Sequence, residues 1–287
     1  GMIMPQGQSF YKINENPFSI LGKSSIHMRG MMGQFFIGIV VIYVIMNWTP
    51  EFLSMAFPYT VMDFLVDIGK IDSEIAAKIS GAPTVAMYLF ALLFNGVMKL
   101  GKALYVLTFM RNRKVEYGAI AEGFRFYFKA LLLFLVETFI VAVWAMLLII
   151  PGIIAAIAFS QSFFILADNP EKGVFEILSE SKMRMFGNKM TYVKLIVAYI
   201  PYFLIAYLPI IVISNLSFIN SETISGIIVL LIAEIPLFCA YGFLSLGQSV
   251  FYELLISEGF DNFRYTGEDA FRQELPVRKN IRSNDGK

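Results

Sequence analysis

Five polar side chains lie within long apolar stretches of the sequence and are candidates for binding a ligand. They are Asn95, Lys99, Lys102, Glu137 and Glu234. All but the asparagine are ionisable, and an ionisable group inside an apolar helix is costly unless it has a partner or a function. The first three are spaced i, i+4 and i+7, so they lie on one face of a helix. These five residues form the candidate ligand-binding site.

Three roles remain open for the two lysines. In the first, Lys99 or Lys102 forms an ion pair with one of the two glutamates and holds the helices together. In the second, the lysines line a cavity for an anionic group, such as a lipid phosphate or the carboxylate of an amphiphile. In the third, they extend their ammonium groups along the helix to the aqueous face.

The sequence lacks the residues that common catalytic sites require. It contains one histidine, His27, and one cysteine, Cys239, so a zinc site of His and Cys ligands is not expected. We find no glycine-rich phosphate loop with its lysine. We therefore expect that the protein is not an enzyme and has no metal and no cofactor. The formal net charge of +1 provides no basic field for nucleic acid.

The composition indicates a membrane protein. Hydrophobic residues make up 57% of the chain and charged residues 16%, with a mean hydropathy of +0.66. A soluble domain has about 45–50% apolar and about 25% charged residues. A helix needs about 20 residues to cross a bilayer. Six apolar stretches approach or exceed that length, near residues 33–48, 83–110, 128–150, 153–167, 190–213 and 224–255.

The predicted fold class is therefore all-α, a polytopic membrane helix bundle with six spans. Pro151-Gly152 predicts a tight hairpin between the third and fourth spans. Pro236 predicts a kink in the sixth. Nineteen of the 23 lysines and arginines fall on one side of this topology. Because basic residues are enriched in cytoplasmic segments, both termini are predicted to be cytoplasmic.

Part of the sequence repeats. A short amphipathic helix is predicted before the fifth span, with Asp168 to Glu171 as its N-terminal cap and Gly187 at its end. Six of its residues recur at an offset of 157 positions: Phe18, Ile20, Leu21, Ser24, Met28 and Gly30 match Phe175, Ile177, Leu178, Ser181, Met185 and Gly187. Residues 115–126 form a weaker third copy. The predicted unit is an interfacial helix followed by a two-helix hairpin.

Three such units predict a pseudo-threefold axis along the membrane normal. We expect a single membrane domain over residues 1–257, with units near residues 16–110, 115–167 and 169–255. Residues 258–287 alternate charges with few apolar residues and are predicted to be a loosely ordered cytoplasmic tail.

Most of the chain resembles a bacterial integral-membrane family, the domain of unknown function 975, and the resemblance is sharpest over residues 147–189. The resemblance is carried by residues 147–154, Phe159-Ser160, residues 166–170, Ser181, Met185, Gly187, Lys189 and Phe251-Tyr252. The chain is also distantly similar to the membrane region attached to some bacterial glycerophosphodiester phosphodiesterases, but it has no such catalytic domain. The resemblance implies a multi-span helical fold in the bacterial cytoplasmic membrane, and it implies no activity.

Two functions fit these observations. The first is binding or translocation of a lipid or other amphiphile near the intramembrane lysines. The second is a non-catalytic accessory or scaffold subunit that docks a protein partner. Membrane lipids are expected partners in both cases. The first function predicts a cavity that reaches Lys99 and Lys102, and the second predicts a closed bundle.

Overall fold

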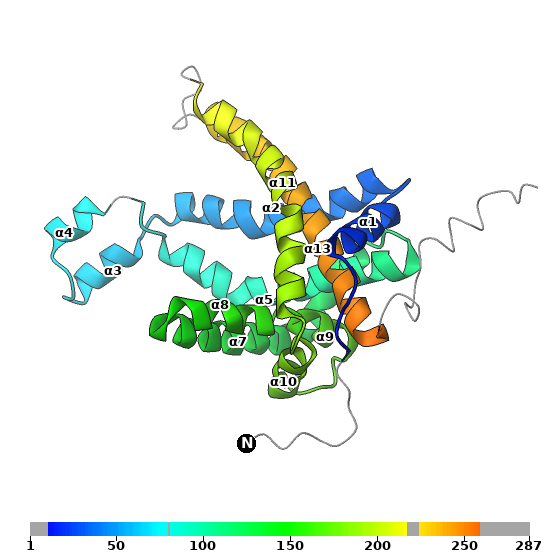
Figure 1. Cartoon of the computed structure of the whole chain (residues 1–287). Helices are drawn as coiled ribbons and strands as arrows, with labels where there is room; N and C mark the ends of the chain where they lie inside the picture. The colour runs from blue at the N-terminus through cyan, green and yellow to red at the C-terminus, as the bar shows by residue number, and fades with distance from the viewer. Residues whose placement is uncertain (1–10, 80, 217–223, 259–287) are drawn as a thin grey trace, which may run out of the picture.

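The computed structural model describes residues 11–79, 81–216 and 224–258, and within these ranges the chain is helical apart from turns and one isolated β-bridge (Figure 1). Six segments are long and apolar enough to cross a membrane: Met32–Ala56, Val85–Asn112, Gly118–Leu147, Ile149–Asp168, Lys189–Ser214 and Ile228–Ser257. The prediction of an all-α membrane bundle with six spans is confirmed.

The helices have the following bounds: α1 (Pro17–His27), α2 (Met32–Ala56), α3 (Val61–Asp67), α4 (Ser73–Lys78), α5 (Val85–Asn112), α6 (Gly118–Glu122), α7 (Tyr127–Leu147), α8 (Ile149–Ala158), α9 (Ser162–Asp168), α10 (Val174–Arg184), α11 (Lys189–Ser214), α12 (Ile224–Ala233) and α13 (Ile235–Ser257). A 3-10 turn, Gly123–Phe126, joins α6 to α7.

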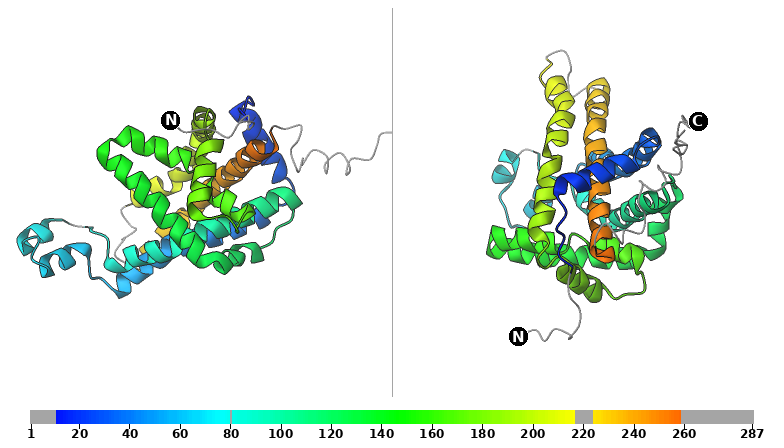
Figure 2. Two further views of the ribbon diagram at one scale, coloured as in Figure 1. Left: turned by 90° about the horizontal axis from the view of Figure 1, so that it is seen from below. Right: turned by 45° about the vertical axis from the view of Figure 1, so that its right-hand side comes forward.

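The spans form three hairpins. α2 packs against α5, α7 against α8, and α11 against α12 and α13, while α9 continues α8. The hairpins come together around α5 and α13, and the far ends of α2, α7 and α11 lie well apart (Figures 1 and 2). The outer faces of the hairpins are apolar: Met146 and Phe139 of α7, for example, are 86% and 70% exposed. Such exposure is expected of helices that face lipid.

The buried residues concentrate where the second helices of the hairpins meet. We call this region the packed end; it comprises residues 97–110 of α5, all of α9 and residues 243–255 of α13. Its core is rich in aromatic rings, such as Phe164 stacked on Tyr252 with centroids 5.4 Å apart. The first hairpin adds Phe35 of α2, whose ring centroid lies 4.5 Å from that of Phe109. The Phe164–Tyr252 contact joins the second and third hairpins, and the Phe35–Phe109 contact holds the two helices of the first together.

The hairpin between the third and fourth spans is present as predicted, but the break lies elsewhere. The helical pattern is interrupted at Leu148, which has an extended backbone (φ −156°, ψ 136°), and Pro151 and Gly152 lie inside α8. A Cβ at Gly152 would lie 2.7 Å from Cα of Ala145. The glycine therefore allows α7 and α8 to pack closely, and the proline occupies the first turn of α8, where its missing N–H costs nothing.

Two spans contain interruptions. α8 ends at Ala158 and α9 begins at Ser162, a break that the sequence analysis did not predict. The sixth span breaks at Glu234, between α12 and α13. Pro236 lies in the first turn of α13, so the helix is interrupted next to the proline at which a kink was predicted.

The two sequence copies adopt the same local structure. α1 and α10 each contain 11 residues and begin 157 positions apart, as do the spans that follow them. Gly30 and Gly187 both have a positive φ, 80° and 79°, which suits a glycine after a helix end. The third copy differs, because α6 has only five residues. The threefold arrangement of whole units stays a prediction.

One predicted cap is wrong. α10 begins at Val174 after Gly173, whose N–H donates to Glu176 at 3.4 Å, and not at Asp168–Glu171. Asp168 instead ends α9, and its carboxylate binds groups on other helices. The predicted tail, residues 258–287, lies outside the described residues except for Glu258.

Glycines on α5 hold the lysine-bearing helix close to its neighbours. A Cβ at Gly96 would lie 2.5 Å from the carbonyl oxygen of Ala130 on α7, and one at Gly101 would lie 2.6 Å from that of Ile120 on α6. Both obstacles are backbone atoms, which move only if a whole helix moves. The two close approaches therefore fix the position of α5 between α6 and α7.

We predict that Gly101→Ala lowers the free energy of unfolding by about 1–3 kcal/mol, because the added methyl group forces α5 and α6 apart. Gly22→Ala is the matched control: a Cβ at Gly22 in α1 meets nothing within 4 Å, and alanine is the better helix former. Thermal unfolding in one detergent compares the two variants. Equal melting temperatures for both would contradict the close packing of α5.

Candidate functional site

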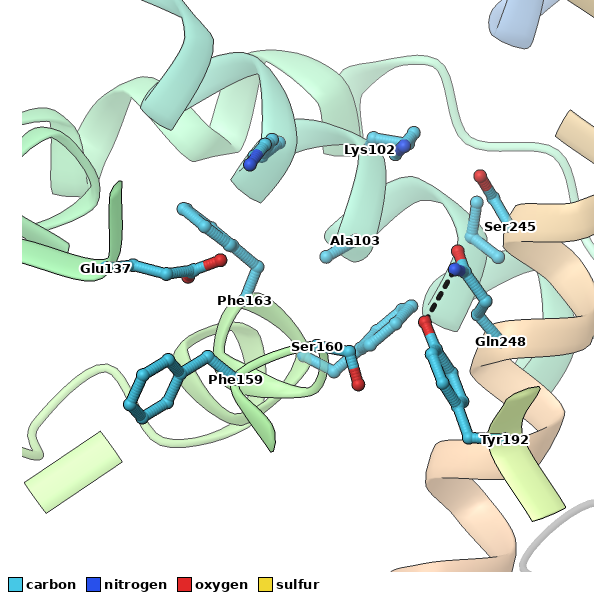
Figure 3. Close-up of a pocket in the computed structure, with 12 residues that line it drawn as sticks. Lys102, Ala103, Glu137, Phe159, Ser160, Phe163, Tyr192, Ser245 and Gln248 are labelled. Carbon is cyan, nitrogen blue, oxygen red and sulfur yellow. Dashed lines mark hydrogen bonds between the residues drawn. The ribbon is translucent and has the colours of Figure 1, made fainter. Parts of the chain in front are cut away.

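A cavity of about 230 Å³ lies beside the break in the fourth span, and all three hairpins contribute to its wall (Figure 3). Its lining residues are Lys99, Lys102, Ala103 and Val106 of α5, Glu137 of α7, Phe159, Ser160, Phe163 and Phe164 of the fourth span, Tyr192 of α11, and Ser245 and Gln248 of α13. The cavity is therefore the place where the three hairpins meet around polar groups.

The two lysines of the candidate site both reach this cavity. Lys102 donates a hydrogen bond to the hydroxyl of Tyr43 at 3.1 Å. The Nζ atom of Lys99 lies 5.0 Å from the ring centroid of Phe134 and 5.4 Å from that of Phe163, which is cation–π geometry. Neither lysine forms a salt bridge with a carboxylate in the part of the chain that the structure describes.

The two glutamates of the candidate site lie in different places. Glu137 is on the cavity wall, where its Oε2 accepts a hydrogen bond from Ser162 at 2.6 Å. Glu234 is at the break in the sixth span, accepts a hydrogen bond from Trp48 Nε1 at 3.1 Å, and does not line the cavity. Asn95 does not line it either. The structure thus brings together three of the five predicted residues, Lys99, Lys102 and Glu137.

The break in the fourth span supplies the polar wall opposite the lysines. At the break the backbone makes tight turns, with the N–H of Ser162 donating to the carbonyl of Phe159 at 3.0 Å. The side-chain amide of Gln161 donates to Ser160 Oγ at 2.9 Å. Gln161 is fully buried, and its Oε1 has no hydrogen-bond partner among the described residues. Non-helical backbone at membrane depth is tolerated where it is buried in protein or lines a cavity.

Two further cavity residues come from the sixth span and were not predicted. Gln248 donates to the hydroxyl of Tyr192 at 2.7 Å, the dashed line in Figure 3. Ser245 donates to the carbonyl of Tyr241 at 2.8 Å. Ser245, Gln248 and Ser249 are spaced i, i+3 and i+4 in an apolar helix. That polar stripe is the sequence signal that could have identified this wall.

A buried ion network lies at the packed end. Arg111 of α5 donates two hydrogen bonds to Asp168 of α9, at 2.6 and 2.8 Å, and one to Glu253 of α13. Tyr252 also donates to Asp168, at 3.0 Å. The side chain of Glu253 is 1% exposed. Glu253 falls inside the predicted sixth span but was not among the predicted site residues.

A second ion network holds α10 to the preceding turn. Glu180 pairs with Lys172 at 2.6 Å and with Arg184 at 2.7 Å. Burial alone would raise the pKa of Glu180, but the hydrogen bonds and charges of the two cations outweigh it and hold that pKa below its ordinary value. Glu180 is thus held ionised by its two cationic partners.

The fold and the cavity define a class of protein: a multi-pass helical membrane protein with a polar cavity at a broken span. No family model, curated protein or solved structure matches the chain. The family resemblance carried by the fourth span and α10 stays a prediction. No group of three or more His, Cys, Asp and Glu side chains able to hold a metal ion occurs in the residues described.

We predict that Arg111→Met lowers the free energy of unfolding by about 3–5 kcal/mol, because it leaves the buried carboxylate of Glu253 and the partly buried one of Asp168 without their cation. Glu74→Gln is the control, since the Glu74–Lys78 pair is exposed and such pairs contribute about 0–1 kcal/mol. Chemical unfolding in detergent measures both variants. A loss for Arg111→Met no larger than that for Glu74→Gln would show that the network does not hold the packed end together.

Proposed function

We propose that the protein binds or translocates an amphiphile and holds the anionic headgroup in the cavity between Lys99 and Lys102. The observation that carries the proposal is that both ammonium groups reach a polar cavity without a salt bridge to a described carboxylate. Glu137 is the one carboxylate in the cavity lining, and it shares the cavity with two ammonium groups. The remaining positive charge is costly inside the bundle. An anionic ligand would neutralise it, and this excess of positive charge favours the cavity role over a simple ion pair.

The lining of the cavity suits a headgroup of mixed character. Lys99, Lys102, Ser160 and Gln248 can donate hydrogen bonds, as phosphate or carboxylate oxygens require. Phe159, Phe163 and Phe164 form an apolar part of the wall. At about 230 Å³ the cavity is smaller than pockets that enclose drug-sized ligands, which measure about 300–1,000 Å³. It therefore fits a headgroup, with the hydrocarbon tail lying between the hairpins.

The proposed location is the bacterial cytoplasmic membrane, with both termini in the cytoplasm. Of the described basic residues, most lie on or close to α1, α6 and α10 in the sequence. By the positive-inside rule, the packed end then faces the cytoplasmic side of the membrane. In this orientation the cavity lies in the cytoplasmic half of the bundle.

We also interpret the architecture as three repeated units. The matching bounds of α1 and α10, and the glycines with positive φ that follow them, support two of the units. Each unit then contributes its second helix to the cavity wall. A scaffold protein would need no such cavity, so the cavity favours ligand binding over the accessory role.

Native mass spectrometry of the protein from mild detergent tests the proposed function. We expect a specific bound mass in the wild type that is lost in Lys99→Ala/Lys102→Ala. Lys114→Ala/Lys194→Ala, which removes two exposed lysines, is the matched control and should retain the mass. No bound mass in the wild type, or a mass retained in the cavity variant, would contradict the proposal and favour the scaffold function.

A further inference from the structure

A second hollow, of about 230 Å³, opens on the outside of the bundle between α7, α8 and the start of α11. We call it the outer groove; it is lined by Trp144, Pro151, Ile154, Ala155, Ala158, Phe159, Lys182 and Lys189. Its apolar part is accessible, because Trp144 is 47% and Ile154 46% exposed. Phe159 lines both the outer groove and the cavity.

The surroundings of the outer groove indicate that its occupant comes from the lipid phase. The same hairpin exposes large apolar side chains on its surface, including Ile150 at 71% and Ile153 at 54%. α7 and α8 belong to spans three and four. A bilayer would cover this surface, so hydrocarbon chains are the molecules that reach the groove.

The charged end of the outer groove indicates an anionic occupant. Lys182 and Lys189 form no salt bridge within the described ranges. The nearby acid of α10 is engaged elsewhere, since Glu180 pairs with Lys172 and Arg184. Two cations therefore lie beside an apolar groove with no described carboxylate to neutralise them. A phospholipid has the complementary arrangement, a negative phosphate joined to hydrocarbon chains.

We propose that the outer groove binds an anionic phospholipid, with its phosphate at Lys182 and Lys189 and an acyl chain along Trp144 and Ile154. This site uses different lysines from the cavity. It goes beyond the proposed function, which does not require a lipid in the groove. Because Phe159 separates the two hollows, a lipid in the groove lies next to the cavity wall.

Tryptophan fluorescence offers a direct test, because the chain contains two tryptophans. Trp48→Phe leaves Trp144 in the outer groove as the reporter. The protein is reconstituted in phosphatidylcholine bilayers that contain brominated phosphatidylglycerol or brominated phosphatidylcholine, and quenching of Trp144 gives their relative binding. We expect phosphatidylglycerol to bind at least roughly fivefold more strongly than phosphatidylcholine, because one lysine near an anionic headgroup contributes about that factor.

In the Trp48→Phe background, the ratio of phosphatidylglycerol to phosphatidylcholine binding should fall to about one in Lys182→Ala/Lys189→Ala, because the charges that attract the phosphate are gone. The ratio should stay high in the control variant Lys114→Ala/Lys194→Ala. Equal quenching by the two lipids in the parent would overturn the proposal in favour of a neutral lipid. A preference that survives loss of Lys182 and Lys189 would also overturn it. So would a preference that disappears only with Lys99→Ala/Lys102→Ala, because Trp144 would then report a lipid of the cavity. Ligand binding in the cavity is tested separately, by the bound mass in native mass spectrometry.

Discussion

The arrangement of the hairpins depends on keeping the ammonium groups of Lys99 and Lys102 out of the hydrocarbon. A charge at membrane depth must face protein or a polar cavity. Here the helix that bears both lysines is held by close backbone contacts at Gly96 and Gly101, and their ammonium groups lie against aromatic rings and a tyrosine hydroxyl. The polar cavity between the hairpins follows from this requirement.

The broken fourth span completes the cavity. A continuous helix from Ile149 to Asp168 would satisfy its own backbone groups and leave little polarity to face the lysines. The interruption at residues 159–161 instead turns Ser160 toward the cavity and places Phe163 over Lys99. Broken helices near binding sites are a recurrent feature of membrane transporters. The break and the lysines together account for a polar centre inside an apolar bundle.

Local patterns in the sequence predicted much of this fold. Long apolar runs identified the six spans, and the 157-residue offset identified two helices with matching bounds. Interactions between distant segments were not predictable in the same way. Nothing near Phe159 resembles a helix breaker, since neither proline nor glycine occurs at residues 159–161. The break therefore has no proline or glycine signal in the local sequence.

The errors in the site have the same origin. Asp168 has the local pattern of a helix cap, yet in the structure its carboxylate binds Arg111, 57 positions away in the chain. Glu234 fits the pattern of an intramembrane acid but binds Trp48, outside the cavity. Lys99, Lys102 and Glu137 were all chosen as intramembrane charges, and all three line one cavity. Which residue each of these side chains binds could be seen only in the folded chain.

The central claim is that Lys99 and Lys102 create an electropositive cavity that an anion can enter. Thiol modification tests it directly, because Cys239 is the one native cysteine. With Cys239→Ser and Ser160→Cys in place, the rates of labelling by an anionic and a cationic methanethiosulfonate are compared. The account predicts that the anionic-to-cationic rate ratio falls when Lys99→Ala/Lys102→Ala is added. An unchanged ratio, or no labelling of the cavity thiol by either reagent, would contradict it.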